Sequence, residues 1–381
     1  MYRKMCIFFF FDIVLFILAL NYNEKNKRLF YWISALVLLF LLGMHNGTGD
    51  PNGYGYDYPH YLNFFRGKYD MYGSVDSPST YELEWPYFYF CKILRLIGNY
   101  DFIYIIALCL IVNVPFLLYV RKYSKNAPLS MLWLFLIQNT QVHLFINTAH
   151  RQMIAHAFFM VGIFAMMSFH ERNEKWFCDV KKDIFIAVCF IIAILGHSSS
   201  YFVIVALLGV YYLPQISKKI QILVVIASMV IGVYMYKAFF GYFTNLMFIL
   251  GDVDEISRST HYLVDDVYDA SNVSLNALLP QTLMTIGVIY CCTETELKSF
   301  FVKCLLLATI FVNIFYSVPL ISRSFTSLWI LAITGCVPMA FRNTMKGKLI
   351  MSVIVVMLLY TAYKAYSSPA FRLLPFKLIW E

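Results

Sequence analysis

The sequence predicts an all-α, polytopic integral membrane protein with about 12 transmembrane helices and two longer external loops. Of its 381 residues, 60% are apolar and 14% are charged, and long apolar blocks recur from end to end. Soluble domains carry about 45–50% apolar and about 25% charged residues, and a helix needs about 20 apolar residues to cross a membrane. A soluble enzyme and a disulfide-stapled secreted domain are therefore excluded. Continuous apolar runs also argue against a transmembrane barrel, whose strands alternate.

The apolar blocks define the expected helices in order along the chain. Residues 85–98 are apolar and aromatic but contain Lys92 and Arg95, which favours an amphipathic helix in the outer membrane interface. A further span there would invert the orientation of everything that follows. The expected spans lie at about 5–20, 29–44, 101–120, 129–146, 152–169, 184–196, 200–213, 220–240, 276–292, 304–320, 324–340 and 349–366.

Basic residues alternate with these spans. Six short connections, at 21–28, 121–127, 170–183, 214–219, 293–303 and 341–348, hold 17 of the 30 Lys and Arg residues. The positive-inside rule places all six in the cytoplasm and both termini outside, although Arg3 and Lys4 oppose this. The net charge of +8 therefore reflects topology, and no nucleic-acid partner is expected. The first span lacks a small-residue cleavage site and is read as retained, so residues 1–381 form one predicted transmembrane domain.

The residue types give little support for a metal or cofactor. None of the nine cysteines lies in a long external loop, and there is no Cys-x-x-Cys, so most are expected to be small buried hydrophobes. Asp252-Val253-Asp254 invites a metal-dependent interpretation, because paired acidic residues can hold a divalent cation. Because such pairs arise easily in an acidic loop, we expect neither a metal site nor a cofactor.

Two long external loops, at about 45–84 and 241–275, carry unusual side chains. Together they hold twelve acidic residues against only Arg66, Lys68 and Arg258, and they are rich in Tyr and His. Loops of this length in a compact protein are usually functional or disordered. Aromatic faces stack on sugar rings and carboxylates accept hydrogen bonds from hydroxyls, so these loops are predicted to contact sugars. The alternative is a soluble extracytoplasmic cap.

Three short external turns each carry one ionisable group at the outer edge of the helices: Arg151, His197 and Arg323. Ionisable residues at membrane depth are functional hypotheses by default, whereas snorkelling arginines and a packed histidine are the ordinary alternatives. Two arginines can clamp a diphosphate through two-point hydrogen bonds and stabilise the charge that grows on it as it leaves. A nearby His or carboxylate can act as general base for an acceptor hydroxyl. The turns therefore predict metal-free glycosyl transfer from a lipid-diphosphate sugar.

Five segments stand out in order along the chain: Gly55-Tyr56-Asp57-Tyr58-Pro59-His60-Tyr61 with Phe64-Phe65, Glu84-Trp85-Pro86-Tyr87, Arg151-Gln152-Met153-Ile154-Ala155, Gly196-His197-Ser198-Ser199 and Arg323. Together they resemble the EpsG-type proteins among the Wzy-like polysaccharide polymerases. One departure concerns an Arg that the family often carries before its Gly-x-Asp-Tyr. Here that stretch is Met44-His45-Asn46-Gly47, so either His45 or another Arg such as Arg258 would take its place.

The resemblance implies a GT-C-like helical fold and a glycosyltransferase. It would move a growing glycan from undecaprenyl diphosphate onto a lipid-linked repeat unit, at the outer face of the bacterial cytoplasmic membrane, in O-antigen, capsule or exopolysaccharide synthesis. A flippase and a chain-length regulator are the implied protein partners. Arg151 and Arg323 would contact the diphosphate, and His197 or Asp57 would be the acceptor base. The residues expected to bind sugars or hold the arginines are Tyr58, Tyr61, Glu84, His150, Gln152 and Arg258.

The sequence is also compatible with other functions. An O-antigen ligase would use the same donor with a different acceptor. A polyprenyl-monophosphate-sugar transferase would use a related donor that carries one phosphate. A flippase or exporter of lipid-linked oligosaccharide belongs to another class, because it needs polar residues lining a path near the bilayer midplane. The centres of the expected spans are nearly free of charge, with Asp12 as the main exception. This favours an enzyme whose chemistry lies at one face of the membrane.

Overall fold

The computed structural model of the chain describes its residues in several separate ranges. Every regular element in the described part is a helix, which confirms the all-α class. The described residues are 2–43, 57–68, 85–137, 150–171, 179–197, 200–212, 214, 216–234, 275–316, 325, 328–329, 332, 334–341 and 344–367.

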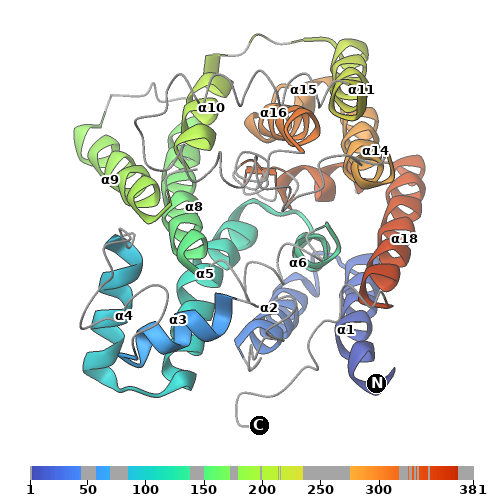
Figure 1. Cartoon of the computed structure of the whole chain (residues 1–381). Helices are drawn as coiled ribbons and strands as arrows, with labels where there is room; N and C mark the ends of the chain where they lie inside the picture. The colour runs from blue at the N-terminus through green and yellow to red at the C-terminus, as the bar shows by residue number, and fades with distance from the viewer. Residues whose placement is uncertain are drawn as a thin grey trace. The chain divides into compact units, whose positions relative to one another are not determined.

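The helices follow the expected apolar segments closely (Figure 1). Helix α4 confirms the helix expected at 85–98, and α3 and α15 are additions that the sequence did not predict. The described residues within 324–340 are also helical. The helices are α1 (Tyr2–Leu20), α2 (Lys27–Gly43), α3 (Asp57–Phe65), α4 (Trp85–Ile97), α5 (Asp101–Tyr123), α6 (Ala127–Ile137), α8 (His150–Glu171), α9 (Val180–Gly196), α10 (Ser200–Tyr212), α11 (Lys218–Tyr234), α14 (Leu275–Cys291), α15 (Glu294–Leu297), α16 (Phe300–Ile314) and α18 (Met345–Ser367).

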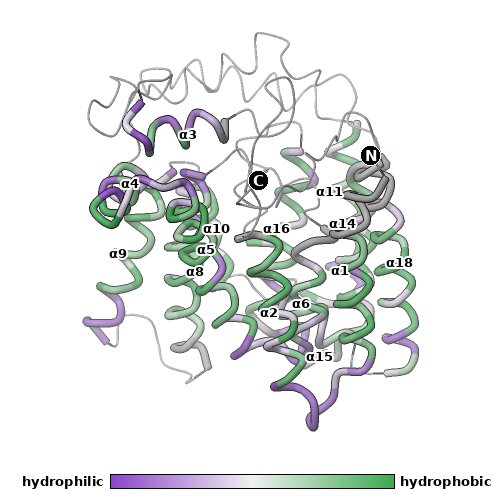
Figure 2. The backbone as a smooth tube through the Cα atoms, turned by 90° about the horizontal axis from the view of Figure 1, so that it is seen from below, coloured by the Kyte–Doolittle hydropathy of each residue, from purple (hydrophilic) through white to green (hydrophobic). Residues whose placement is uncertain are grey.

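Within the described residues, one helix is both long and apolar enough to cross a membrane by itself. Helix α5 has 23 residues, and its most apolar 18-residue window has a mean hydropathy of 2.5. Shorter apolar helices lie at Phe9–Leu20, Ser200–Val210, Leu278–Cys291 and Phe300–Ile314. Figure 2 shows hydrophobic residues along most of these helices and hydrophilic residues in several connections. The count of about 12 spans therefore stays a prediction.

The chain divides into two compact units, Met1–Tyr201 with Leu358–Glu381, and Phe202–Met357. In the first unit, α1 packs on α6 and α2, α2 on α5 and α6, α5 on α8, and α8 on α9. Two long-range bonds tie its helices together: Asn126 Nδ2 donates to the Ala19 carbonyl at 2.9 Å, and the Tyr31 hydroxyl donates to the Leu117 carbonyl at 3.0 Å. Figure 2 shows α3 and α4 at one end of α5, α8 and α9.

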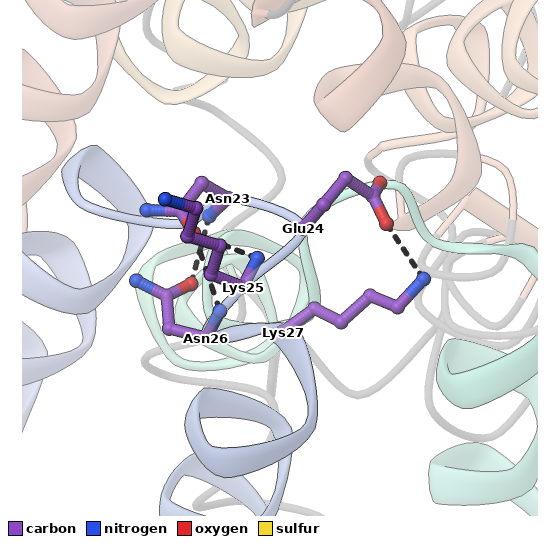
Figure 3. Close-up of polar contacts among 5 residues, drawn as sticks. All are labelled: Asn23, Glu24, Lys25, Asn26 and Lys27. Carbon is purple, nitrogen blue, oxygen red and sulfur yellow. Dashed lines mark hydrogen bonds and ion pairs between the residues drawn. The ribbon is translucent and has the colours of Figure 1, made fainter.

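The connection between α1 and α2 is a tight polar turn (Figure 3). The backbone N–H of Asn23 donates to Asn26 Oδ1 at 2.8 Å. Asn23 Oδ1 in turn accepts from the backbone N–H groups of Lys25 and Asn26 at 2.9 and 3.2 Å. Lys27 pairs with Glu24 at 2.6 Å. Backbone groups that would otherwise lack helical partners are thereby satisfied by side chains, so a short basic turn joins two apolar helices.

In the second unit, α11, α14 and α16 pack against one another around buried polar side chains. Asn313 lies at the centre: its Nδ2 donates to Ser228 Oγ at 3.0 Å and to Thr282 Oγ1 at 3.1 Å, and its Oδ1 accepts from Gln281 Nε2 at 2.8 Å. Gly232 of α11 lies directly against the Asn313 carbonyl oxygen. Small residues and hydrogen-bonding side chains are what close helix packing in an apolar environment requires.

Candidate active site at one end of the first unit

Aromatic side chains from four helices meet at the end of the first unit where α3 and α4 lie. Helix α3 contributes Tyr61, Phe64 and Phe65, whose spacing of three and four residues places them on one helical face. That face packs on α4, and α4 in turn packs on α5, α8 and α9. The short α3 is therefore held by burial of its aromatic face and not by its own length, since isolated helices of nine residues are marginal.

A hydrogen-bonded chain runs through this cluster. The Tyr87 and Tyr104 hydroxyls lie 3.1 Å apart, and the Tyr104 hydroxyl is 2.6 Å from His150 Nδ1. We call Tyr87, Tyr104 and His150 the tyrosine–histidine chain. The Tyr61 ring stacks on the His150 ring with centroids 4.6 Å apart and an interplanar angle of 21°. All four side chains are at most 2% exposed, so the His150 imidazole is fixed from two sides.

The first turn of α8 follows directly from this anchored histidine. His150 is the first residue of the helix, and Arg151 and Gln152 come next. Gln152 is buried, and Arg151 is half-buried with its Nε shielded from solvent. The amino end of a helix carries partial positive charge and unpaired backbone N–H groups. The guanidinium of Arg151 therefore adds a full charge to a helix end that already favours anions.

His197 caps the neighbouring end of α9. Its backbone N–H donates to the Ala193 carbonyl at 3.0 Å, and its side chain is half-buried. A Cβ built on Gly196 would lie 3.1 Å from the Cβ of Ala155, so the two helices are in close contact there. Ala155 is one turn after Arg151 on the same face of α8. The helix ends that carry Arg151 and His197 are thus adjacent.

Comparison with known proteins decides the family of this chain. The model of the EpsG family matches residues 40–378. The chain belongs to the EpsG family. No curated protein and no solved structure matches it. EpsG membership confirms the resemblance seen in the sequence and supports a membrane-associated, polysaccharide polymerase-like role.

The EpsG match contains the whole candidate site and leaves out residues 1–39. Four of the matched segments contribute to the described site: α3 carries Tyr61, α4 carries Tyr87, the first turn of α8 carries Arg151, and the end of α9 carries His197. The buried carboxyl group of Asp12 in α1 lies outside the matched residues. The structural features that surround Arg151 therefore belong to the EpsG part of the chain.

Some expected site residues fall outside what the structure describes. The side chains of Asp57 and Tyr58 are among these, although their backbone begins α3. Tyr61 and His150, expected to touch substrate, are buried against each other; substrate contact by either stays a prediction. Within the described ranges, no group of three His, Cys, Asp or Glu side chains could hold a metal ion. The expected residues outside the described part are His45, Glu84, Asp252, Asp254, Arg258 and Arg323.

Tyr87 and Tyr104 are site residues that sequence reasoning missed. Tyr87 stands within the aromatic EpsG-like segment, but Tyr104 lies in an apolar helix with nothing to distinguish it. Burial raises the pKa of the Tyr87 phenol well above its usual value, and the neighbouring Cys91 and Tyr104 add to this. The phenol therefore stays protonated and keeps its hydrogen bond over the physiological pH range.

An ion pair fixes the end of α3 to the start of α5. Arg66 Nε donates to Asp101 Oδ1 at 2.8 Å, and Arg66 Nη2 contacts Asp101 Oδ2. This two-point geometry is the strong form of an arginine–carboxylate pair. About a third of each side chain is exposed, so solvent screening limits the energy of the pair to about 0.5–1 kcal/mol. The pair holds the helix that carries Tyr61 and begins at Asp57.

We expect a double-mutant cycle to detect this pair. Arg66→Gln and Asp101→Asn should each lower the free energy of unfolding, and the double variant should lose about 0.5–1 kcal/mol less than the sum of the two. Chemical denaturation of the purified protein in detergent measures all four values. Strictly additive losses would show that the pair does not hold α3.

Proposed function

We propose that this EpsG-family protein is a polysaccharide polymerase that uses a lipid-diphosphate donor. It would move a growing glycan from undecaprenyl diphosphate onto the non-reducing end of a new lipid-linked repeat unit, at the outer face of the bacterial cytoplasmic membrane. The observation that carries this proposal is the position of Arg151. It lies in the first turn of a long helix, next to a histidine that is stacked and hydrogen-bonded in place.

This arrangement fits the chemistry of a leaving diphosphate. Breaking the bond between the sugar and the diphosphate concentrates negative charge on the leaving oxygen. A guanidinium donates two parallel hydrogen bonds to such a group, and the backbone N–H groups of the α8 amino end add further donors. Preorganised donors lower the barrier because they need no reorganisation as the charge develops. Arg323 is the second proposed cation, on the sequence alone.

The acceptor hydroxyl needs a general base at the same end of the helices as Arg151. His197 lies at the end of α9 that touches the first turns of α8. A neutral imidazole near Arg151 can take the proton from an acceptor hydroxyl as the glycosidic bond forms. Asp57, at the start of α3, is the alternative base. Gln152 and Glu84 are proposed to orient sugar hydroxyls or the arginines.

A transporter is less well supported. Its polar residues should line a path, whereas the polar residues buried between α11, α14 and α16 bond to one another. Thr285 and Thr309 share a hydrogen bond of 2.9 Å, and Trp329 Nε1 donates to Thr309 Oγ1 at 3.0 Å. These uncharged side chains are fully buried. Mutually satisfied groups of this kind hold helices together.

The proposal is tested with purified protein and a defined undecaprenyl-diphosphate repeat unit. We expect a ladder of polymer lengths, formed in excess EDTA at nearly the rate seen without it, because arginine and backbone donors neutralise the leaving group. Arg151→Ala protein, which should keep only a small residual rate, serves as the control. If chelation stopped the reaction and magnesium or manganese restored it, a metal-dependent transferase with Asp252 and Asp254 as ligands would replace this account. Movement of the intact lipid across liposomes without a ladder would support the flippase instead.

A further inference from the structure

We propose that Tyr104 is a positioning residue for Arg151 and acts through His150. This inference rests on the proposed function, because Arg151 is the group that contacts the donor diphosphate in it. Tyr104 itself is fully buried, so its proposed effect on the reaction is indirect. Its hydroxyl is 2.6 Å from His150 Nδ1 and 3.1 Å from the Tyr87 hydroxyl, so it joins α4 and α5 to the first residue of α8.

The first turn of a helix needs such an anchor. Its backbone N–H groups have no partners within the helix, so the turn is held only through its carbonyls and side chains. In α8 the anchor is the His150 ring, which lies between the stacked Tyr61 ring and the Tyr104 hydroxyl. Arg151 is the next residue along the chain. Loss of the hydrogen bond would remove a direct restraint on the ring and allow the guanidinium to shift.

A small shift at this place has a large catalytic effect. A displacement of about 1 Å in a catalytic group can cost as much as about 100-fold in rate. Because Arg151 stabilises charge that develops in the transition state, the loss should appear mainly in kcat and only weakly in the KM for the donor. We expect Tyr104→Phe, which removes one oxygen atom, to lower kcat by about 10-fold.

Tyr31→Phe is the matched control. The Tyr31 hydroxyl also makes one buried hydrogen bond, to the Leu117 carbonyl at 3.0 Å, near the opposite end of α5. Each variant loses one buried phenol oxygen, with one hydrogen bond lost in Tyr31→Phe and two in Tyr104→Phe, so both should lower the stability. Only Tyr104→Phe should also lower kcat. Equal kcat values for the two variants would overturn the inference.

Two replacements of His150 test the atom involved. The amide of His150→Asn lies near the position of Nδ1 and can donate to or accept from the Tyr104 hydroxyl. The amide of His150→Gln reaches nearer the position of Nε2 and misses that hydroxyl. We expect His150→Asn to retain several-fold more activity than His150→Gln. The reverse order would show that the Tyr104 bond does not act through Nδ1.

Combination with Arg151→Ala separates positioning from general damage. If Tyr104 acts through Arg151, adding Tyr104→Phe to Arg151→Ala should produce no further loss, since the group that it positions is gone. A further 10-fold loss in that background would overturn the inference while leaving the proposed polymerase intact. Wild-type protein that makes no polymer would instead contradict the proposed function. The same four proteins would then be compared for binding of undecaprenyl diphosphate, where non-additive losses support the coupling and additive losses contradict it.

Discussion

Arg151→Lys should lower the polymerisation rate by at least about 10-fold, equivalent to about 1.4 kcal/mol of transition-state stabilisation. Lysine keeps the positive charge but loses the planar fork that donates two hydrogen bonds to one phosphate group. The turn that carries Arg151 is anchored by His150 and Tyr104, so the new ammonium cannot easily move to compensate. Arg151→Ala should cost more, because the charge is lost as well.

Initial rates with a defined lipid-linked repeat unit measure this effect. Arg121→Lys is a matched control, since Arg121 is an exposed cation near the opposite end of α5, where a cytoplasmic location is predicted. It should keep the wild-type rate. Equal rates for Arg151→Lys and wild-type protein would mean that Arg151 acts as a simple surface charge, and the diphosphate would have to be bound elsewhere.

Gly232→Ala should destabilise the second unit by about 3 kcal/mol. The added Cβ would overlap the carbonyl oxygen of Asn313, which belongs to the backbone and cannot turn away as a side chain would. Helix α11 would then separate from α16. The separation would also stretch the bond from Asn313 Nδ2 to Ser228 Oγ, which joins these two helices, leaving buried polar groups partly unsatisfied.

Gly209→Ala provides the control for this change. Gly209 lies in α10, and a Cβ there would meet no atom within 4 Å. Because glycine weakens a helix interior by about 0.5–1 kcal/mol relative to alanine, this variant should be as stable as wild-type protein or slightly more so. Thermal unfolding in detergent compares the two variants. Equal melting temperatures would show that α11 and α16 do not approach closely at Gly232.

The sequence predicted the apolar helices because burial in a membrane needs only length and hydrophobicity. It also predicted α4, since Lys92 and Arg95 within an aromatic segment are incompatible with an ordinary span. It missed α3, although Tyr61, Phe64 and Phe65 have helical spacing. A helix this short forms only against α4 and α5, and those partners are not visible in the local sequence.

Helix α15 was missed for a different reason. Its four residues are too few for a periodic pattern, but its start has a local signal. The Thr293 side chain accepts from the Glu296 amide at 3.3 Å, and the Glu296 carboxylate accepts from the Thr293 amide at 2.9 Å. Threonine followed three residues later by glutamate is the capping-box pattern. A search for caps, and not only for apolar runs, would have found this helix.

The candidate site likewise contains residues that the sequence singles out and residues that it does not. Arg151 and His197 stood out because ionisable groups at helix ends in apolar surroundings are rare. Tyr104 did not, because tyrosine is common in this chain and the partner that gives it a role is 46 residues away in sequence. The direction in which it points depends on how α5 packs on α8. The sequence therefore singled out the ionisable residues of the candidate site, whereas the buried residues packed beside them became visible only in the structure.

The number of undecaprenyl diphosphate molecules released for each glycosidic bond formed tests the central claim most directly. Purified protein is incubated with a defined lipid-linked repeat unit, and the released lipid and the polymer are quantified by mass spectrometry. Transfer from a lipid diphosphate, with Arg151 stabilising the leaving group, predicts one undecaprenyl diphosphate per bond and almost none with Arg151→Ala. Release of the monophosphate, or polymer growth without release of any diphosphate, would contradict this account.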